Sequence, residues 1–429
     1  MSDEPTTRAV TNLDKGAPHD GVPLGKNVVR EQLSLPACTV RSDALRANSI
    51  AMLDFLARVG RDLDADIALC PHGKTTMSPD LFRRQLADGC WGISVATPHQ
   101  VRVARHFGIP RILLANELIG RHDIDWVAGE LRRDPGFEFF CLVDSLEAVQ
   151  RLAERADRAS LDRPINVLLE VGYAGGRCGV RSVDTGLAVA RAVHARRPAL
   201  RLVGLETFEG LLQTRPAAEG DAQVTALIGF VAELAARSDA EGLLADADPV
   251  LLSAGGSSFY DLAARILATA NISRPIKIVV RSGCYLIHDV DLYGPQLTRL
   301  RQRDALARRE DLAFTPALEV WAHVLSVPEP SRLVLGAGRR DFGEDAGLPA
   351  LARHFRAGTE LPPPWNAGAH LAAVNDQHGI VDFTPPWDVR VGDLLVLSPS
   401  HPCTTFDKWR TVHVIDEQAT VIDALRTYF

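Results

Sequence analysis

A lysine in the first quarter of the chain is the first candidate for chemistry. The apolar run ADIALC (65–70) ends directly before PHGKTTMSP, so that Lys74 lies in the loop after a strand-like segment. A lysine amine in a protein site can form a Schiff base with an aldehyde, and Gly73 would let the backbone approach a flat ring closely. Taken alone, Lys74 fits a solvated loop lysine as well, since most lysines are exposed.

Two loops in the second half of the chain suit an anion. SAGGSS (253–258) follows an apolar run and precedes a helical stretch, and RSGCYLIHD (281–289) follows the next run. Backbone N–H groups and hydroxyls at a helix N-terminus bind phosphate. The alternative for the two serines is the N-cap of an ordinary helix. The predicted phosphate set is Gly255, Gly256, Ser257 and Tyr285, with Gly283 at the same rim as a further cofactor-binding residue.

A third loop, LEVGYAGGRCG (169–179), ends the fifth apolar run with four glycines. Its Tyr173 and Arg177 could place an aromatic or cationic group against a ring. A flexible loop with a solvated arginine explains the same residues equally well.

Near the C-terminus, SHPCTTFDKWR (400–410) carries a histidine and a cysteine two positions apart. Pro402 disfavours helix for the residue before it, so we expect an extended segment. Residues two apart in an extended chain project to one side, which would bring His401 and Cys403 to one point. Such a pair suits an open zinc site completed by water or substrate. A capped histidine beside a buried cysteine is the alternative.

The elements that must position these loops alternate along the chain. Eight apolar runs are typical of strands, with helix-like stretches between them. This alternation implies parallel pairing through βαβ crossovers and predicts a closed (β/α)8 barrel, with an open doubly wound sheet as the alternative. In a barrel, the loops at the carboxyl ends of the strands form the active site, which is where Lys74 falls. The strand candidates are 66–70, 91–95, 111–115, 137–143, 165–171, 200–206, 249–254 and 276–280.

The sequence changes character after about residue 300. A charged helical segment is followed by short β-like runs that Pro and Gly interrupt, which predicts an antiparallel β domain. We expect a flexible N-terminus (1–23), a segment able to join the β domain (24–45), the barrel (46–305) and the β domain (306–429).

The overall composition excludes several classes of function. The chain has 429 residues, 46% of them hydrophobic, and a net charge of −7 without basic blocks, which favours neither nucleic acid nor an acidic membrane surface as partner. No apolar run reaches the roughly 18 residues needed to cross a bilayer, and the polar, acidic N-terminus is unlike a signal peptide. Seven scattered cysteines without a CxxC pair predict reduced thiols in the cytoplasm.

In this order, these segments resemble the family of D-serine dehydratases and D-threonine aldolases, pyridoxal phosphate enzymes of the alanine-racemase-like fold. PHGKT resembles the P-H-x-K-T motif, which implies that Lys74 binds the cofactor aldehyde and that His72 lies beside the cofactor. The loop ending in Arg177 resembles the segment next to the cofactor ring, and GLETFEG (204–210) resembles another strand-end motif. AGGSS resembles the phosphate loop, SGCY resembles the segment with a tyrosine near the cofactor (Tyr285 here), and HPC resembles the zinc pair of the dehydratases.

Three residues depart from the family pattern. Cys70 stands where an arginine often precedes the lysine motif, Thr76 replaces a histidine after it, and Phe208 replaces a tyrosine. CPHGKTTMSP together with HPCTTFDKWR most resembles a bacterial branch described only as amino-acid deaminases.

The resemblance implies a pyridoxal phosphate- and zinc-dependent lyase that converts a D-β-hydroxy amino acid such as D-serine to a keto acid and ammonia, with Lys74 as base. It also implies a homodimer. Retro-aldol cleavage to glycine and an aldehyde is the alternative, although a cysteine ligand selects zinc and favours elimination. A non-catalytic pyridoxal phosphate-binding protein would lack the C-terminal β domain. A racemase would need a second acid–base group, which we do not find.

Overall fold

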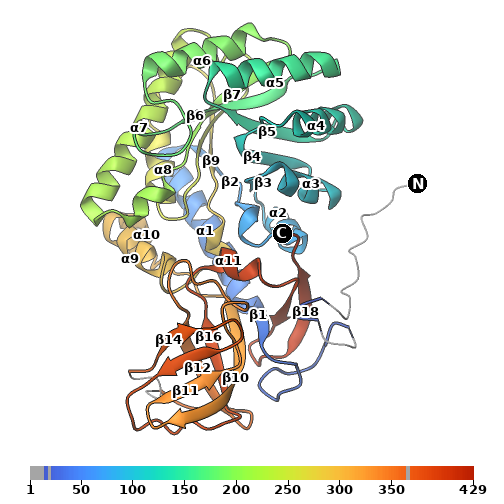
Figure 1. Cartoon of the computed structure of the whole chain (residues 1–429). Helices are drawn as coiled ribbons and strands as arrows, with labels where there is room; N and C mark the ends of the chain where they lie inside the picture. The colour runs from blue at the N-terminus through green and yellow to red at the C-terminus, as the bar shows by residue number, and fades with distance from the viewer. Residues whose placement is uncertain (1–13, 18–20, 364–367) are drawn as a thin grey trace.

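Eight parallel strands form the first sheet of this computed structural model, which describes residues 14–17, 21–363 and 368–429. Each strand overlaps one of the eight predicted apolar runs, which confirms the predicted barrel of eight parallel strands (Figure 1). The strands are β2 (Asp66–Leu69), β3 (Ile93–Val95), β4 (Arg111–Glu117), β5 (Glu138–Val143), β6 (Ile165–Val171), β7 (Leu200–Thr207), β8 (Val250–Ala254) and β9 (Ile276–Val280).

The barrel closes between β2 and β3. The sheet order is β2-β9-β8-β7-β6-β5-β4-β3, and the Trp91 N–H donates to the Leu69 carbonyl at 2.8 Å while the Ser94 N–H donates to the Pro71 carbonyl at 2.9 Å. The interior is a packed core, as in other barrels of this kind. It is filled by Cys70, Leu113, Phe140, Leu142, Leu168, Val203, Leu251 and Val279.

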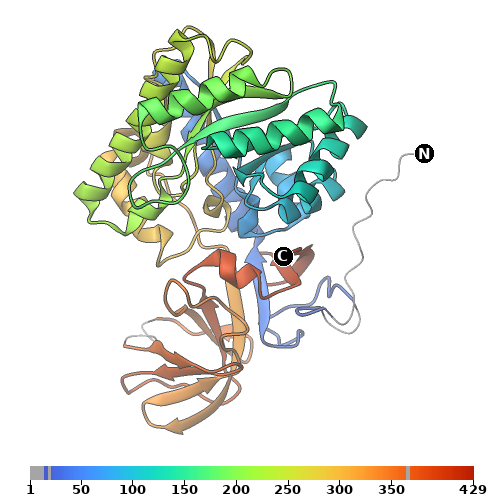
Figure 2. The ribbon, with the colours of Figure 1, turned by 45° about the horizontal axis from the view of Figure 1, so that its top comes forward.

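Helices surround the barrel (Figure 2). Several begin at a hydroxyl N-cap: the side chains of Thr97, Ser145 and Ser182 each accept a hydrogen bond from the N–H three residues on. The first helix packs against β2 and the last barrel helix, and so covers the barrel where a helix after β9 would lie. The helices are α1 (Ser42–Leu63), α2 (Pro79–Ala87), α3 (Pro98–His106), α4 (Arg121–Arg133), α5 (Leu146–Ala159), α6 (Val183–Ala195), α7 (Ala217–Ala240) and α8 (Tyr260–Leu267).

None of the helices in the described ranges is long and apolar enough to cross a bilayer.

The second sheet has ten strands and follows α9 (Tyr293–Arg303) and α10 (Ala305–Arg309). Its strand pairs are antiparallel except for one parallel pair, β1 with β17. The strands are β1 (Ala37–Arg41), β10 (Leu318–Glu329), β11 (Arg332–Leu335), β12 (Ala350–Arg356), β13 (Thr359–Glu360), β14 (His370–Val374), β15 (Gly379–Asp382), β16 (Leu394–Ser398), β17 (Thr411–Ile415) and β18 (Val421–Arg426).

β1 connects the N-terminal segment to this sheet, between β10 and β17. We propose on this basis that residues 46–305 and 306–429 are two domains and that 24–45 belongs with the second. Of the N-terminus predicted to be flexible (1–23), residues 1–13 and 18–20 lie outside the described residues.

The two parts meet at the carboxyl end of β2. The short helix α11 (Pro402–Phe406) packs against the 3₁₀ turn Gly73–Thr75 that follows this strand, and Figure 1 shows α11 between the barrel and the β domain. A residue near the C-terminus also takes part, because the Tyr428 N–H donates to the Met77 carbonyl at 2.9 Å. The second domain therefore lies directly beside the loop that carries Lys74.

Candidate functional site

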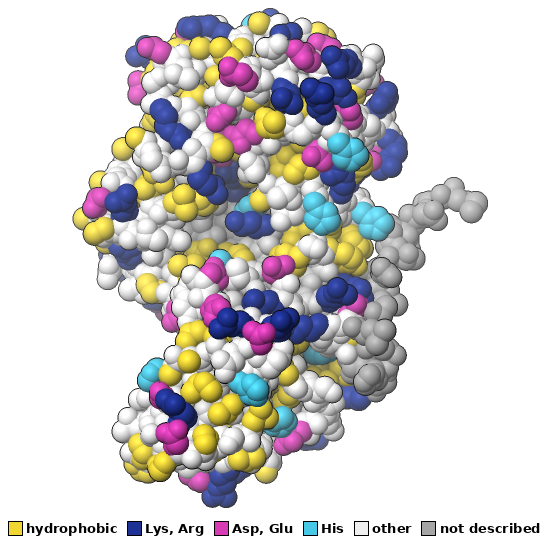
Figure 3. Space-filling view, in the orientation of Figure 1, with side chains coloured by type: hydrophobic (Ala, Val, Ile, Leu, Met, Phe, Trp, Pro, Cys, Tyr) yellow, Lys and Arg dark blue, Asp and Glu magenta, His cyan; other side chains and the backbone are white. Residues whose placement is uncertain are grey.

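A cavity of about 300 Å³ opens at the carboxyl ends of the barrel strands, at the lower end of the size range of small-molecule sites. Its walls carry three cationic side chains, those of Lys74, Arg177 and Arg281, and two carboxyl groups, those of Glu170 and Glu206. In the space-filling view, Lys and Arg side chains lie in a hollow on this face of the molecule (Figure 3). This is the end of a barrel at which catalytic sites form.

Lys74 lines the cavity from the 3₁₀ turn after β2, and its side chain is exposed. His72 lines the cavity beside it, with Nδ1 3.3 Å from the Ser94 hydroxyl. Burial, followed by the positive charge of Lys74, lowers the pKa of His72 to about 3. His72 is therefore neutral at physiological pH and adds no positive charge beside Lys74.

Gly73 is required by packing within the protein. A Cβ at this position would lie 2.7 Å from Cε1 of Phe82 on α2 and 3.0 Å from Cγ2 of Ile93 on β3. We expected Gly73 to let a flat ring approach the backbone. Packing within the protein already explains the glycine, because the turn lies directly against the Phe82 ring of α2.

A buried ion pair joins Arg281 and Glu206 at the cavity, where the side chains are 3% and 1% exposed. Arg281 Nη2 also donates to the Thr207 carbonyl at 3.1 Å, whereas Nε and Nη1 are buried without a hydrogen-bond partner. Burial, and then the neighbouring Glu206 carboxylate, raise the pKa of Glu170 to about 10, so this group is a neutral acid at pH 7. The sequence analysis missed all three residues, although Arg281 directly precedes the SGCY segment.

Arg177, which the resemblance places next to the cofactor ring, lines the cavity, with its guanidinium 4.2 Å from the centre of the Phe208 ring. A cation over an aromatic face is attracted to it, which holds this exposed arginine at the rim. Tyr173, from the same loop, is half-buried and is not among the residues that line the cavity.

The two glycine N–H groups predicted to bind phosphate have a protein partner. Gly255 N donates to Glu209 Oε2 at 3.2 Å, and Gly256 N donates to Glu209 Oε1 at 2.9 Å. Glu209 is fully buried, and burial raises its pKa above the ordinary value. The acceptor of these two N–H groups in this structure is thus a carboxyl group of the chain itself.

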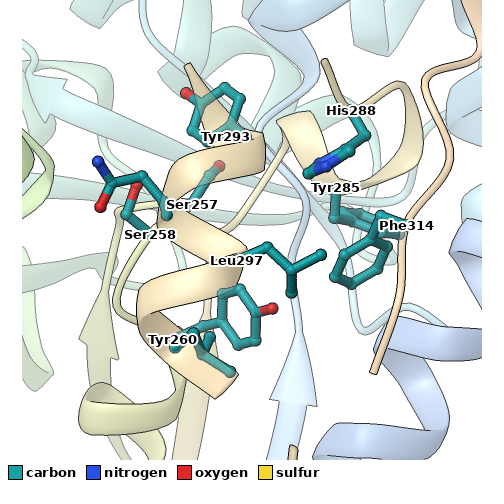
Figure 4. Close-up of a pocket in the computed structure, with 10 residues that line it drawn as sticks. Ser257, Ser258, Tyr260, Tyr285, His288, Tyr293, Leu297 and Phe314 are labelled. Atoms are coloured by element: carbon teal, nitrogen blue, oxygen red, sulfur yellow. The ribbon is translucent and has the colours of Figure 1, made fainter. Parts of the chain in front are cut away.

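The remaining phosphate candidates lie together but face elsewhere. The Ser257 hydroxyl accepts hydrogen bonds from Gly283 N at 3.2 Å and Cys284 N at 3.4 Å, which joins the loops after β8 and β9. Tyr285 is buried, and its hydroxyl accepts from Gln85 Nε2 at 3.1 Å. Ser257 and Tyr285 line a separate cavity of about 20 Å³, shown in Figure 4, rather than the one that contains Lys74. The predicted contact between the Tyr285 hydroxyl and a phosphate is therefore not supported.

His401 and Cys403 do not lie in an extended segment, so that prediction is wrong. His401 has extended backbone angles, but Pro402 begins the helix α11, and Cys403 lies in its first turn. Proline is favoured at the first helical position because it has no N–H to leave unpaired there. His401 Nδ1 is 2.7 Å from Asp345 Oδ2.

The Cys403 sulfur instead meets a second sulfur. Cys284 Sγ lies 3.8 Å from Cys403 Sγ, and the Thr75 hydroxyl lies 3.6 Å from the first and 3.5 Å from the second. A hydrogen bond from the Cys403 thiol lowers the pKa of Cys284 to about 6. Sequence reasoning missed Cys284 and Asp345 because they lie 119 and 56 residues from their partners, with no local spacing to join them.

A second group of potential metal ligands includes one residue of the cavity wall, Cys178. In the part of the chain that the structure describes, Glu117, Asp144 and Cys178 form the one set of three whose ligand atoms lie within 4.8 Å of one another. Asp144 Oδ2 accepts a hydrogen bond from Gly179 N at 3.0 Å. Exposed acidic groups of this kind are common without an ion.

Two family models match the chain in the order of its two sheets. The alanine racemase N-terminal domain matches residues 67–248, and a serine dehydratase domain matches residues 317–415. The crystal structure of D-threonine aldolase from Filomicrobium marinum has a TM-score of 0.74 at 23% identity and covers 94% of this chain and 97% of its own. The predicted combination of barrel and β domain is thus a known architecture.

Two named relatives cover most of the chain. It is 29% identical to a D-threonine aldolase of Arthrobacter sp. over 80% of each chain. It is 27% identical to the D-threo-3-hydroxyaspartate dehydratase of Delftia sp. strain HT23 over 87% of this chain and 92% of the relative. A structure of that dehydratase, at 19% identity and a TM-score of 0.66, is the metal-free form of a cysteine-to-alanine mutant and covers 94% of this chain and 99% of its own.

Proposed function

We propose that this chain, which resembles the family of D-serine dehydratases and D-threonine aldolases, is a pyridoxal phosphate-dependent lyase of D-β-hydroxy amino acids. More narrowly, we propose a zinc-assisted dehydratase that converts a substrate such as D-serine to a keto acid and ammonia. One observation carries this proposal: the Thr75 hydroxyl, next to Lys74 in the chain, contacts the Cys403 sulfur at 3.5 Å. The amine and the candidate metal ligands thus lie at the same end of the barrel.

The cavity fits a planar, anionic cofactor that accepts hydrogen bonds. Two buried N–H groups of Arg281 have no partner, which is uncommon in a protein interior and points to a missing acceptor. Lys74 would hold the cofactor aldehyde, and Arg177 would lie at the ring. For the phosphate, the Gly256 N–H would become a donor if the Glu209 carboxyl group moved away, whereas the Gly255 N–H also donates to the Thr207 carbonyl at 3.1 Å. Pyridoxal phosphate supplies an electron sink for negative charge that develops at Cα.

The chain's own side chains then divide the work between Cα and Cβ of the substrate. Lys74, with its amine free, accepts the Cα proton as general base. His401 and Cys403 would hold a zinc ion near the β-hydroxyl, where a Lewis acid helps this group to leave as hydroxide. The Cα–H and Cβ–O bonds break, a Cα–Cβ double bond forms, and hydrolysis of the unsaturated amine yields the keto acid and ammonia.

Retro-aldol cleavage is the second candidate, favoured by the name of the Arthrobacter relative. The same cavity would then remove the proton of the β-hydroxyl, and the Cα–Cβ bond would break to give glycine and an aldehyde. A thiolate ligand favours zinc over harder metals, which is our reason for preferring elimination. The proposal also includes a homodimer, which the family resemblance implies, and a cytoplasmic location, which the scattered cysteines predicted.

A substrate panel separates these reactions. Purified enzyme with cofactor and zinc is incubated with D-serine, D-threonine and D-threo-3-hydroxyaspartate, and keto acid, ammonia, glycine and aldehyde are measured. We expect keto acid with ammonia. Glycine with an aldehyde as the sole products would refute the dehydratase, and no turnover of any of the three would refute the lyase.

The role of Lys74 has its own test. Lys74→Ala should lose both turnover and the absorbance band of the lysine-bound cofactor. Lys277→Ala is the matched control, because this lysine lies near the amino end of β9, at the opposite end of the barrel. Retention of the band in Lys74→Ala would assign the cofactor to another amine.

A further inference from the structure

The distance between two sulfur atoms adds a residue to the metal site of the proposed function. Cys284 Sγ and Cys403 Sγ are 3.8 Å apart. Two thiolates that bind one tetrahedral zinc, each at about 2.3 Å, lie about 3.8 Å from one another. The sulfur atoms of a disulfide would be only about 2.05 Å apart. We propose that Cys284 is a ligand of the metal, together with Cys403 and His401; this inference rests on the proposed function for the location of the ion.

The two sulfurs come from different parts of the fold. Cys284 lies in the 3₁₀ turn Cys284–Leu286 after β9 of the barrel and is buried, whereas Cys403 lies on α11 of the second domain. An ion between them would join the two domains at the mouth of the barrel. It would also lie beside the Thr75 hydroxyl, one residue from Lys74.

The surroundings of Cys284 suit a bound thiolate. The Thr75 hydroxyl lies 3.6 Å from its sulfur. Hydrogen-bonding partners outside the metal ligands orient those ligands and adjust their basicity. This hydroxyl, which the turn after β2 supplies, holds the sulfur in place from the side of the barrel.

A buried carboxylate oxygen nearby gives a second, independent indication of a missing cation. Asp289 is 1% exposed, and its Oδ1 accepts hydrogen bonds from Leu292 N at 2.6 Å and Tyr293 N at 2.8 Å. Oδ2 is buried and has no partner. Asp289 lies in the same segment after β9 as Cys284. A buried carboxyl group with one oxygen unpartnered is uncommon, and a dication on the sulfur pair would supply the opposite charge.

His401 completes the set of three. Its Nδ1 faces Asp345, which leaves Nε2 for a metal. The imidazole is not within 4.8 Å of both sulfurs, so the side chain must turn toward them when the ion binds. Three protein ligands with one open position is the arrangement of catalytic zinc sites. The open position would receive the β-hydroxyl of the substrate.

X-ray absorption at the zinc edge tests this inference on the intact holoenzyme, independently of turnover. We expect two sulfur ligands per zinc in the wild type. A single sulfur would overturn the role of Cys284 and leave the metal pair of the proposed function intact. This measurement needs no variant, so it decides the question even if a substitution prevents folding.

Three cysteine variants complete the test, each checked for folding by circular dichroism. Cys284→Ser should reduce the sulfur count from two to one and weaken zinc binding by about 100-fold or more, beyond the range for loss of an outer partner. Cys403→Ser should do the same. Cys178→Ser is the control and should retain zinc with two sulfurs. Wild-type zinc affinity in Cys284→Ser would overturn the inference, and loss of zinc in Cys178→Ser would place the ion at Glu117 and Asp144 instead.

Discussion

Replacement of Asp345 tests whether an orienting carboxylate controls the metal site. Asp345 Oδ2 is 2.7 Å from His401 Nδ1, and Oδ1 accepts a hydrogen bond from the Thr404 hydroxyl at 2.5 Å. Partial burial raises the pKa of Asp345, but the hydrogen bonds from Thr404 and His401 lower it below the ordinary value. The group is therefore an anion that fixes the proton of His401 on Nδ1 and leaves the lone pair on Nε2.

The magnitude follows from the exposure of this pair. Loss of such an outer partner typically weakens metal binding by about 10- to 100-fold, or about 1.4–2.7 kcal/mol. The Asp345 side chain is 48% exposed and that of His401 is 20% exposed. Water can replace part of the interaction, so we expect the lower part of this range for Asp345→Ala, about 10- to 30-fold. Asp345→Asn should cost less, because its amide oxygen still accepts the Nδ1–H bond.

The assay is a titration of the metal-free protein with zinc in competition with a chromophoric chelator. His401→Ala serves as the reference for full loss of the imidazole. Thr404→Val is the matched control, because it removes the other hydrogen bond of the same carboxylate and should change the zinc Kd much less than Asp345→Ala does. Wild-type affinity in Asp345→Ala, with a clear loss in His401→Ala, would show that the carboxylate does not orient the ligand and would refute the reasoning.

Three further predictions concern the barrel. Arg281→Met leaves the Glu206 carboxylate buried without its partner and should lower the free energy of unfolding in urea by about 3–5 kcal/mol. The double variant with Glu206→Gln should recover most of this loss. Equal losses in the single and the double variant would argue against the ion pair. The pKa of Glu170 is about 10 in the native state, so the native carboxyl keeps a proton that the unfolded chain releases above its ordinary pKa. Wild-type stability should therefore fall relative to Glu170→Gln by as much as about 1.4 kcal/mol per pH unit as the pH rises from about 6 to about 8, and parallel urea unfolding curves would contradict this. Gly73→Ala should lower the thermal midpoint of unfolding, because the clash with Phe82 costs about 1–3 kcal/mol. Phe82→Leu in the same chain should relieve part of this clash. An unchanged midpoint in Gly73→Ala would show that the turn can shift.

The sequence alone determined the barrel and the position of the amine. A strand buried on both faces must be apolar over consecutive residues, and this is a local property that can be read from the chain. The eight runs therefore predicted eight strands in order, and Lys74 followed as a residue at the carboxyl end of the first. For Arg177 the sequence left a ring contact and a solvated loop arginine equally open, and the structure places this residue at the cavity.

Only the tertiary structure decided which groups meet. The two glycine N–H groups suited a phosphate, but in the structure both donate to Glu209, which lies 46 residues before Gly255 in the chain. H-x-C predicted an extended segment, but Pro402 begins the helix α11, which includes Cys403. The sulfur that does face Cys403 belongs to Cys284, 119 residues earlier. Local patterns determine elements because burial acts residue by residue, whereas a hydrogen bond or a shared ion depends on which loops the folded barrel and its β domain bring within a few ångströms.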